Sequence, residues 1–403
     1  MKKYSLIVLV FTVFFSLMSM TALAETDAER LDRLEGEIKD LKKKQATTEN
    51  VLSKAESVWT KYNMRLYGRI KFDLNYDTSE FKKYNDFIGV VKEDASNDSV
   101  NFNPRDTRFG FETSHTDGNW TAKGRFEIDF YGDTNGSNLI PRMRVGYIDL
   151  ANNSSGTSLR AGQDWIPVAQ QNPATIDFGV LSAAGNVWWR LPQVTLRQEL
   201  GDVELLLSAM KHRREDTEDE ERMPWFLGRV AYNFGDGNLV ALGGGYRTGE
   251  YISDGGVHTG KDIDRWLAAL ELKLNLGPVL LKAEGFWGEA LGKDFLRYDP
   301  NNPKEIEAIG GFISLTANAT DDITVSAGYG IDDPRNDDMK TMRGTLSDNS
   351  DRRFTKNSIA FLNTWYKVTK GVKVGAEIMY VETERFSSTD AGMRYTLSTF
   401  YNF

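Results

Sequence analysis

The sequence predicts an all-β transmembrane protein, a 16-stranded antiparallel β-barrel preceded by a short N-terminal heptad helix. Two observations carry this prediction. Apolar and polar residues alternate with a period of two from about Asn63 to the C-terminus, which gives each strand one apolar and one polar face. The connections between the alternating segments are short and long in turn, as they are in transmembrane barrels.

The composition of the 403-residue chain excludes several classes of function. It contains no Cys, which rules out a disulfide scaffold, a cysteine-based zinc site and a cysteine nucleophile. The formal net charge of −9 argues against nucleic acid as a partner, because there is no basic excess to neutralise phosphates. With three His and no Gly-x-Ser-x-Gly motif, we expect neither an enzyme nor a bound cofactor or metal.

The first 24 residues have the features of a secretory signal peptide. Lys2 and Lys3 supply a positive start, an apolar stretch follows over residues 6–18, and Ala22-Leu23-Ala24 forms a small-x-small cleavage site. A membrane anchor is the alternative, but it needs about 20 apolar residues. Here a highly charged segment begins directly at Glu25, so we expect cleavage after Ala24.

Residues 25–60 carry a heptad pattern. Its a positions are Leu31, Ile38, Gln45, Leu52 and Trp59, and its d positions are Leu34, Leu41, Thr48 and Ala55. A helix this short is marginal alone, so self-association is the natural way to bury its apolar stripe. We therefore predict a coiled coil in which five residues mediate oligomerisation: Leu31, Leu34, Ile38, Leu41 and Leu52. A lone amphipathic helix lying on the barrel or on lipid is the alternative.

The barrel is predicted over residues 61–403. The expected strands lie near 63–76, 105–115, 119–131, 141–151, 157–164, 191–200, 202–212, 224–234, 238–248, 262–276, 278–289, 306–318, 322–331, 354–368, 372–384 and 391–403. The short connections carry turn residues, such as Gly235-Asp236-Gly237 and Lys370-Gly371. The long connections are expected at 77–104, 132–140, 165–190, 213–223, 249–261, 290–305, 332–353 and 385–390.

The last strand and the aromatic residues are typical of outer-membrane barrels. The chain closes on Phe403 after an alternating strand, which predicts recognition by the barrel-assembly machinery. Aromatic residues concentrate near strand ends, which suits two interfacial girdles: Tyr76, Trp120, Phe130, Trp188, Trp189, Trp225, Phe234, Trp266, Trp287, Trp365, Tyr380, Tyr401 and Phe403. These features and the signal peptide together place the barrel in the bacterial outer membrane, with the N-terminal helix in the periplasm.

The polar face of the strands is expected to line the lumen. In the first eight strands its basic members outnumber its acidic members by eleven to six. The basic residues are Arg65, Arg69, Lys71, Arg108, Lys123, Arg125, Arg142, Arg144, Arg160, Arg197 and Arg229, and the acidic residues are Asp73, Glu112, Glu127, Asp129, Asp164 and Glu199. Arginines in a pore favour anions and can bind a carboxylate or phosphate through paired hydrogen bonds. The alternative is that they pair with the acidic residues and brace the wall.

The connection 165–190 is long and unusually apolar, and Asp177 is its only acidic residue. Such a loop is expected to fold into the barrel as a constriction facing the arginines, and its key residues would be Trp165, Asp177 and Phe178. A cap over the trimer contact is the alternative.

Two acidic segments are predicted in other long loops. The run 215–221 holds six acidic residues among seven, and 332–351 adds six more. Both are expected to be solvated. An alternative is capture of divalent cations that bridge phosphates of lipopolysaccharide, although the spacing matches no defined calcium loop.

The chain resembles the DcaP-like porins over nearly all of its mature length. The resemblance follows the heptad helix and rests on Met64-Arg65-Leu66-Tyr67-Gly68, Thr107-Arg108-Phe109-Gly110-Phe111, Glu127-Ile128-Asp129-Phe130-Tyr131-Gly132, Arg160-Ala161-Gly162-Gln163-Asp164-Trp165, Asn363-Thr364-Trp365, Gly375-Ala376-Glu377 and the terminal Phe403. It implies a homotrimer of 16-stranded barrels with a periplasmic coiled coil, passing anionic solutes such as dicarboxylates.

The function expected from the sequence is that of a diffusion porin for small hydrophilic solutes, with a preference for anions such as dicarboxylates. Outer-membrane lipid, lipopolysaccharide and small anionic solutes would be its partners. The competing hypothesis is a structural outer-membrane protein that tethers the membrane through its periplasmic coiled coil. The heptad permits a tether, whereas the charged lumen face argues against a closed, filled barrel.

Overall fold

The computed structural model describes residues 27–81, 87–93, 97–132, 139–213, 223–253, 257–292, 294–296, 305–343 and 354–403. The predicted signal peptide over 1–24 and the acidic run 215–221 lie outside these ranges. The chain divides into two units, Met1–Lys61 and Tyr62–Phe403.

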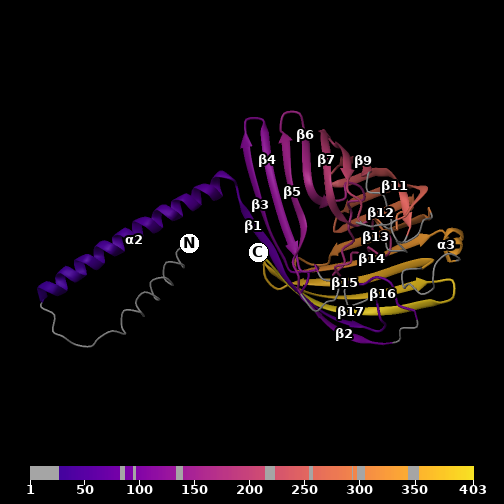
Figure 1. Ribbon diagram of the computed structural model, residues 1–403. Coiled ribbons are helices and arrows are strands. Elements are labelled where there is room, and N and C mark those ends of the chain that lie inside the picture. Colours follow the sequence, from indigo (N-terminus) through magenta and orange to yellow (C-terminus); the bar gives the residue numbers. More distant parts are fainter. Residues whose placement is uncertain are drawn as a thin grey trace. The chain divides into compact units, whose positions relative to one another are not determined.

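The first unit contains a single described helix, α2 (Asp27–Lys61), at the place where the heptad pattern predicts one (Figure 1). No Pro interrupts it, and charged residues with good helix propensity fill the positions between the heptad residues. The five residues predicted to mediate oligomerisation, four leucines and one isoleucine, form the seam of the helix. They are 45–59% exposed in the single chain. Among the described residues, neither helix has the length and hydrophobicity needed to cross a membrane.

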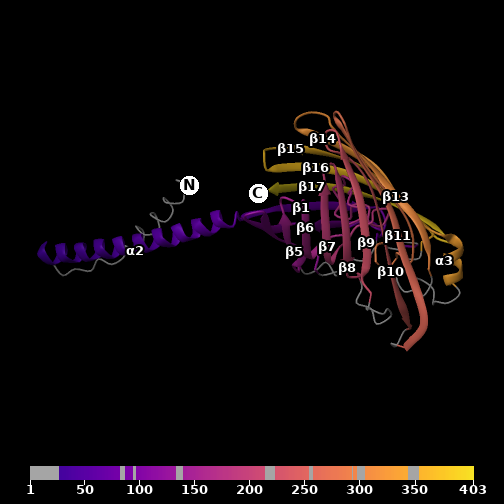
Figure 2. The same cartoon turned by 90° about the horizontal axis from the view of Figure 1, so that it is seen from above.

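The second unit is a closed antiparallel barrel (Figures 1 and 2). Its strands are β1 (Arg65–Asp77), β2 (Ser99–Asn103), β3 (Arg108–Asp117), β4 (Trp120–Asp129), β5 (Arg142–Asn152), β6 (Thr157–Trp165), β7 (Arg190–Leu200), β8 (Val203–Met210), β9 (Trp225–Phe234), β10 (Asn238–Ser253), β11 (Val257–Leu276), β12 (Val279–Glu289), β13 (Glu307–Asn318), β14 (Ile323–Pro334), β15 (Lys356–Lys367), β16 (Val372–Glu384) and β17 (Thr389–Asn402). From β3 onward each strand pairs with the next, and β17 pairs with β1 to close the ring. A short helix, α3 (Asn336–Arg343), follows β14.

The wall has 16 positions because β2 and β3 form one interrupted strand. Both pair with β1, β2 opposite Asp73–Asp77 and β3 opposite Arg65–Arg69. The break between them includes Pro104, which has no N–H to donate to the sheet. The predicted strand count is therefore confirmed, although the second strand was expected only over 105–115.

The two faces of the wall have the polarity of a protein in lipid. Alternate residues of β1 show it: Ile70 is 54% exposed, whereas Lys71 and Asp73 are buried. The same inversion holds around the ring, with Leu242, Leu270 and many other large apolar side chains exposed outward. A closed barrel in a bilayer needs this arrangement, because every backbone group is paired within the sheet and the outer face meets hydrocarbon.

Three predicted features of the barrel are wrong in detail. Residues 249–261 do not form a long loop, because the β10–β11 ladder continues through Glu250 opposite Asp262 and on to Ser253 opposite Val257. Trp188 and Trp225 are not girdle residues, since both are buried inside the unit. Trp225 donates its indole N–H to Asp294 and packs edge-on against Phe295.

Replacing an outward leucine by a charged residue is expected to destabilise the barrel strongly. Leu242 is 64% exposed and is flanked in register by Leu270 and Val230, which also face outward. Leu242→Arg should cost up to about 2–4 kcal/mol of folding free energy in vesicles, because arginine on the lipid face is costly near the bilayer centre. An exposed leucine of a soluble protein would show a change of only about 0.5 kcal/mol.

Urea titration in lipid vesicles, followed by heat-modifiable mobility in gels, measures this cost. Leu242→Phe is the control and should retain nearly the stability of the natural protein. An equal, small effect of both variants would contradict the assignment of this face to lipid.

Candidate functional site

The loop 166–189, which joins β6 to β7, lies inside the barrel. Its backbone and side chains are hydrogen-bonded to inward residues of strands far from its own: to Lys71 in β1, Glu271 in β11, Glu284 in β12, Ser314 in β13, Asn363 in β15, Glu377 in β16 and Arg394 in β17. A loop outside the barrel could not reach all of these residues. These contacts place the loop among the inward side chains of the wall.

Two features let the loop lie against the wall. Its apolar side chains are buried, and Val168, Leu181 and Val187 are each at most 1% exposed. At Gly185 the backbone adopts φ +88°, and a Cβ there would lie 2.1 Å from the carbonyl oxygen of Gly311 in β13. Two glycines thus allow the loop and the strand to touch backbone to backbone.

Carboxylates hold the buried backbone of the loop. Glu377 accepts hydrogen bonds from the N–H groups of Ile176 and Asp177, both at 2.7 Å. Asp177 in turn accepts bonds from the N–H of Ile88 and from Arg394 Nη1, the latter at 2.9 Å. The predicted constriction residue Asp177 is thus a buried anchor of the loop. Bonds of this kind, with one charged partner, are each worth roughly 1.5–3 kcal/mol.

A second segment packs inside with the loop and was not expected there. Residues 87–91 belong to the predicted external connection 77–104, yet Ile88 and Val91 are each 1% exposed. The Val91 N–H donates to Thr383 in β16 at 3.0 Å. The short apolar run at 87–91 is the signal in the sequence that could have revealed this packing.

The part of the wall formed by β1 and β3–β9 carries the predicted basic residues, and their exposure separates them into three groups. Arg65 and Lys123 are exposed. A second group is half-buried: Arg69, Arg108, Arg125, Arg142, Arg160 and Arg197. The third group is buried together with three of the predicted acidic residues and braces the wall: Lys71, Arg144, Arg229, Asp73, Glu127 and Asp129. Glu112, which pairs with Arg65, is half-buried.

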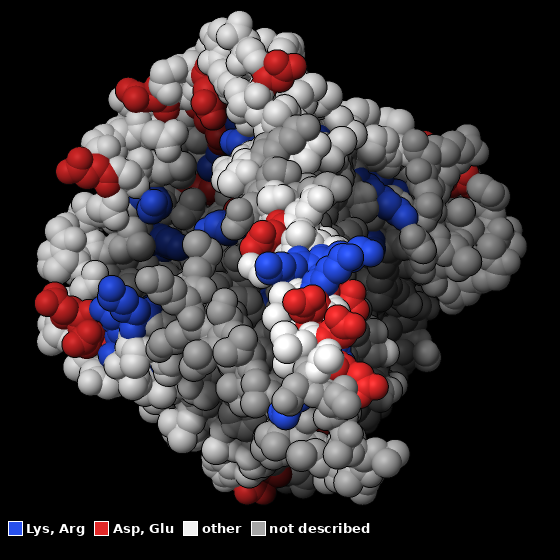
Figure 3. Space-filling view, turned by 90° about the vertical axis from the view of Figure 1, so that its left-hand side faces the viewer, with Lys and Arg blue, Asp and Glu red and all other residues white. Residues whose placement is uncertain are grey.

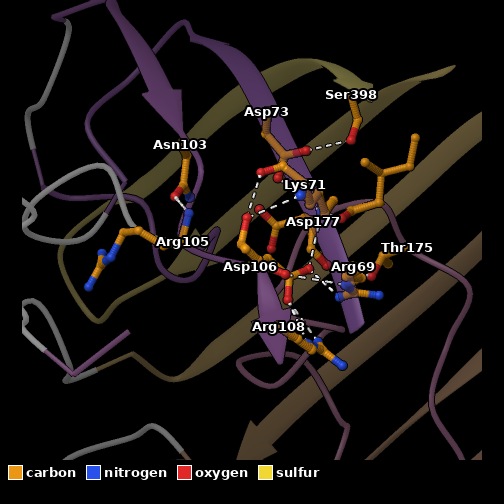
Figure 4. A network of polar contacts seen from close by, with 12 residues as sticks. Arg69, Lys71, Asp73, Asn103, Arg105, Asp106, Arg108, Thr175, Asp177 and Ser398 are labelled. Atoms are coloured by element: carbon orange, nitrogen blue, oxygen red, sulfur yellow. Dashed lines mark hydrogen bonds and ion pairs between the residues drawn. The ribbon is translucent and has the colours of Figure 1, made fainter. Parts of the chain in front are cut away.

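In the pairs that Arg69, Arg108, Arg142 and Arg160 form with Asp106, Asp129 and Asp149, the carboxylate is buried and the guanidinium is not. In the pair of Arg197 with Glu204 the two side chains are 33% and 21% exposed. Arg142 is 34% exposed and its partner Asp129 is 0% exposed. Arg160 and Asp149 are 23% and 7% exposed. Arg69 and Arg108 share the buried Asp106, which also pairs with Lys71 (Figure 4). In the pairs of Arg69, Arg108, Arg142 and Arg160 the basic member is therefore the more exposed one.

Several residues of this wall could not be found from alternation. Asp106 lies in the break between β2 and β3, where no parity applies. A β-bulge at Arg144 shifts the register, because Glu127 pairs with Val145 and Ile128 with Met143, and this turns Asp149 inward. The alternation along β7 predicts that Arg190 points outward. It is the first residue of the strand, however, and it contacts aromatic rings of the loop.

A hollow remains between the loop and this part of the wall. It is bordered by Arg160 and Arg197 of the wall and by Trp165, Pro167 and Gln170 at the start of the loop. Figure 3, which looks toward one end of the barrel, shows Lys and Arg side chains gathered in a hollow and Asp and Glu side chains on the rim around it. Phe178, the third predicted loop residue, is buried against Tyr131, with ring centres 4.1 Å apart.

A closed barrel with an apolar outer face and a charged interior defines a channel protein of a membrane. The sequence profile of the Gram-negative porins matches residues 46–385. The chain belongs to this family, and it is an outer-membrane diffusion porin. No curated protein sequence matches it closely enough to count as a relative.

Solved structures share the fold. The outer membrane channel DcaP of Acinetobacter baumannii is 21% identical, with a TM-score of 0.72 over 84% of this chain and 97% of that one. An anion-selective porin from Comamonas acidovorans is 14% identical, with a TM-score of 0.61 over 84% and 99%. OmpT of Vibrio cholerae in its trimer form is 17% identical, with a TM-score of 0.53 over 84% and 99%. The resemblance to DcaP-like porins thus holds for the fold.

Removing the carboxylate that holds the loop is expected to widen the passage. Glu377→Ala deletes the acceptor for the N–H groups of Ile176 and Asp177 and for the Asn363 amide. These groups then lack a partner in a buried place, so the loop should loosen and the single-channel conductance and its noise should rise. Planar-bilayer recording measures both.

Glu382→Ala is the matched control, because Glu382 is on the same strand and accepts a bond from Tyr380 on the outer side. This variant should conduct like the natural protein. A folded Glu377→Ala protein with unchanged conductance would contradict an anchoring role.

Proposed function

We propose that this porin passes small hydrophilic solutes with a preference for anions such as dicarboxylates, through an arginine-lined lumen narrowed by the loop 165–190. The observation that carries the proposal is the asymmetry of burial within the ion pairs of the wall. Asp129 and Asp149 are buried, whereas Arg142 and Arg160 keep a quarter to a third of their side chains accessible. A passing ion therefore meets guanidinium groups first.

The position of the loop supports the same conclusion. It contacts β11–β17 and β1, and so it covers the acidic groups there, including Glu271, Glu284 and Glu377. Arg142 in β5 and Arg160 in β6 keep part of their guanidinium groups accessible. A lumen with fixed guanidinium donors attracts carboxylates and offers them paired hydrogen bonds. The shared fold of the anion-selective porin from Comamonas acidovorans agrees with this proposal.

Neutralising one half-exposed arginine is expected to weaken the preference for anions. Arg142→Gln leaves Asp129 paired with Arg144, so the wall keeps its brace. The ratio of Cl⁻ to K⁺ permeability should fall by up to about fivefold, the factor that corresponds to about 1 kcal/mol for a unit charge 4 Å from an ion in water. The natural protein should also lose selectivity between about 0.1 and 1 M KCl, as the Debye length falls from about 10 to 3 Å.

The reversal potential of the purified protein under a KCl gradient measures this ratio. Arg335→Gln is the control, because Arg335 lies beyond the end of β14, is 60% exposed and pairs with Glu307. A natural protein that prefers K⁺ would reject the proposal. Absence of any conductance would instead favour a structural tether.

We further propose that the protein is a homotrimer and that α2 forms a periplasmic coiled coil. The support is the exposed seam of α2, in which Leu31, Leu34 and Leu41 are 45–59% exposed in one chain. The trimer form of a structure with the same fold agrees with this assembly. Contact with lipopolysaccharide, and recognition of Phe403 by the barrel-assembly machinery, are proposed on the basis of the family's location in the outer membrane.

Charges placed in the seam are expected to weaken the oligomer. The double variant Leu34→Glu, Leu41→Glu puts two like charges on d positions and should lower the fraction of trimer in detergent. Analytical ultracentrifugation measures this fraction. Lys39→Glu with Lys43→Glu changes charge at the outer b and f positions and should leave the assembly intact. Equal trimer fractions in both double variants would show that the helix does not associate.

A further inference from the structure

Arg190, the first residue of β7, differs from the other arginines of the lumen. Its Nη1 atom is buried and has no hydrogen-bond partner among the described residues, and no described carboxylate forms an ion pair with it. Its guanidinium lies against two indole rings, 4.7 Å from the centre of Trp165 and 5.0 Å from that of Trp188. These cation–π contacts hold the guanidinium without using its N–H donors.

The rings connect Arg190 to two other arginines. Trp188 packs edge-on against Phe178, with ring centres 5.5 Å apart. Arg142 and Arg144 lie 5.7 and 5.6 Å from the centre of the same Phe178 ring. Three guanidiniums therefore share one aromatic platform.

This cluster has more positive than negative charge. Asp129 is shared by Arg142 and Arg144, and Glu127 is shared by Arg144 and Arg125. Neither carboxylate forms an ion pair with Arg190. A buried donor that lacks a partner costs roughly 1–3 kcal/mol, and proteins keep such a group where a ligand or an ordered water completes it.

We propose that Arg190, together with Arg142 at the same aromatic cluster, forms a saturable binding subsite for a small oxyanion, a carboxylate or a phosphate. This inference rests on the proposed anion preference and deepens it, because a general preference needs only an electric field, whereas a subsite needs a fixed donor. The Nη1 donor of Arg190 would bind one oxygen of the ligand. The half-exposed Arg142 would add a second positive charge.

Conductance measured against added oxyanion tests the proposal. The natural protein is placed in a planar bilayer in KCl at constant ionic strength, and inorganic phosphate or malonate replaces part of the chloride. We expect the current to fall to a plateau with increasing probe. Arg190→Gln should raise the half-saturating concentration about tenfold, as expected for the loss of one charge-assisted hydrogen bond. Arg190→Lys should retain only part of the binding, because it keeps the charge and loses the stacked plane.

Arg197→Gln is the matched control. It removes the same charge from the same strand, but Arg197 pairs with Glu204 and lies outside the aromatic platform. Its half-saturating concentration should stay within about twofold of the natural value. The probe that saturates at the lower concentration identifies the ligand as a carboxylate or a phosphate.

The same planar-bilayer recordings distinguish a failure of this inference from a failure of the proposed function. Anion selectivity without saturation by either probe would overturn the subsite and leave the anion preference intact. Equal shifts in Arg190→Gln and Arg197→Gln would also overturn it, since a long-range field would then explain both. A reversal potential that favours K⁺ would overturn the subsite and the anion preference together.

Discussion

The capture of buried loop amides by carboxylates of the wall is the interaction on which the rest of this channel depends. Ile176, Asp177 and Val187 are buried, so their N–H groups need acceptors within the protein. Glu377 and Glu284 supply them from two different strands. These acidic side chains are thereby withdrawn from the passage. In the function we propose, the half-exposed arginines then determine the chemistry of the passage, so this chemistry depends on how the loop is held.

The fold could be predicted from the sequence because lipid imposes a simple rule on every strand. Each outward position must be apolar, so the alternation of Ile70, Lys71 and Phe72 has only one physical solution in a membrane protein. The same rule gave the strand count and the alternation of turns and long loops. It could not give the β10–β11 extension to Ser253 and Val257, since strands that rise beyond the lipid no longer need an apolar face.

The site was predicted less completely, because its geometry depends on departures from alternation. The bulge at Arg144 changes the parity within β5, so Asp149 joins Arg160 although the sequence pattern places Asp149 outside. The break in the strand after Asn103 places Asp106 between two arginines, and no alternation in the sequence predicts this contact. Arg190 contacts the aromatic rings of the loop, although the alternation of its strand predicts that it points outward. These positions are set by contacts between segments far apart in the chain, and such contacts leave no local pattern.

Bracing of the wall and attraction of anions are usually treated as alternative roles for an arginine, and here the burial of the partners makes them compatible. Arg142 donates from Nε and Nη2 to the two oxygens of Asp129, at 2.8 and 3.1 Å. This fork fixes the plane of the guanidinium, and its remaining N–H groups point away from the wall. Because the side-chain entropy has already been lost in the ion pair, a passing anion meets donors that are ordered in advance. The buried carboxylate thus cancels part of the positive charge of the lumen, but it also holds the arginine in a fixed orientation.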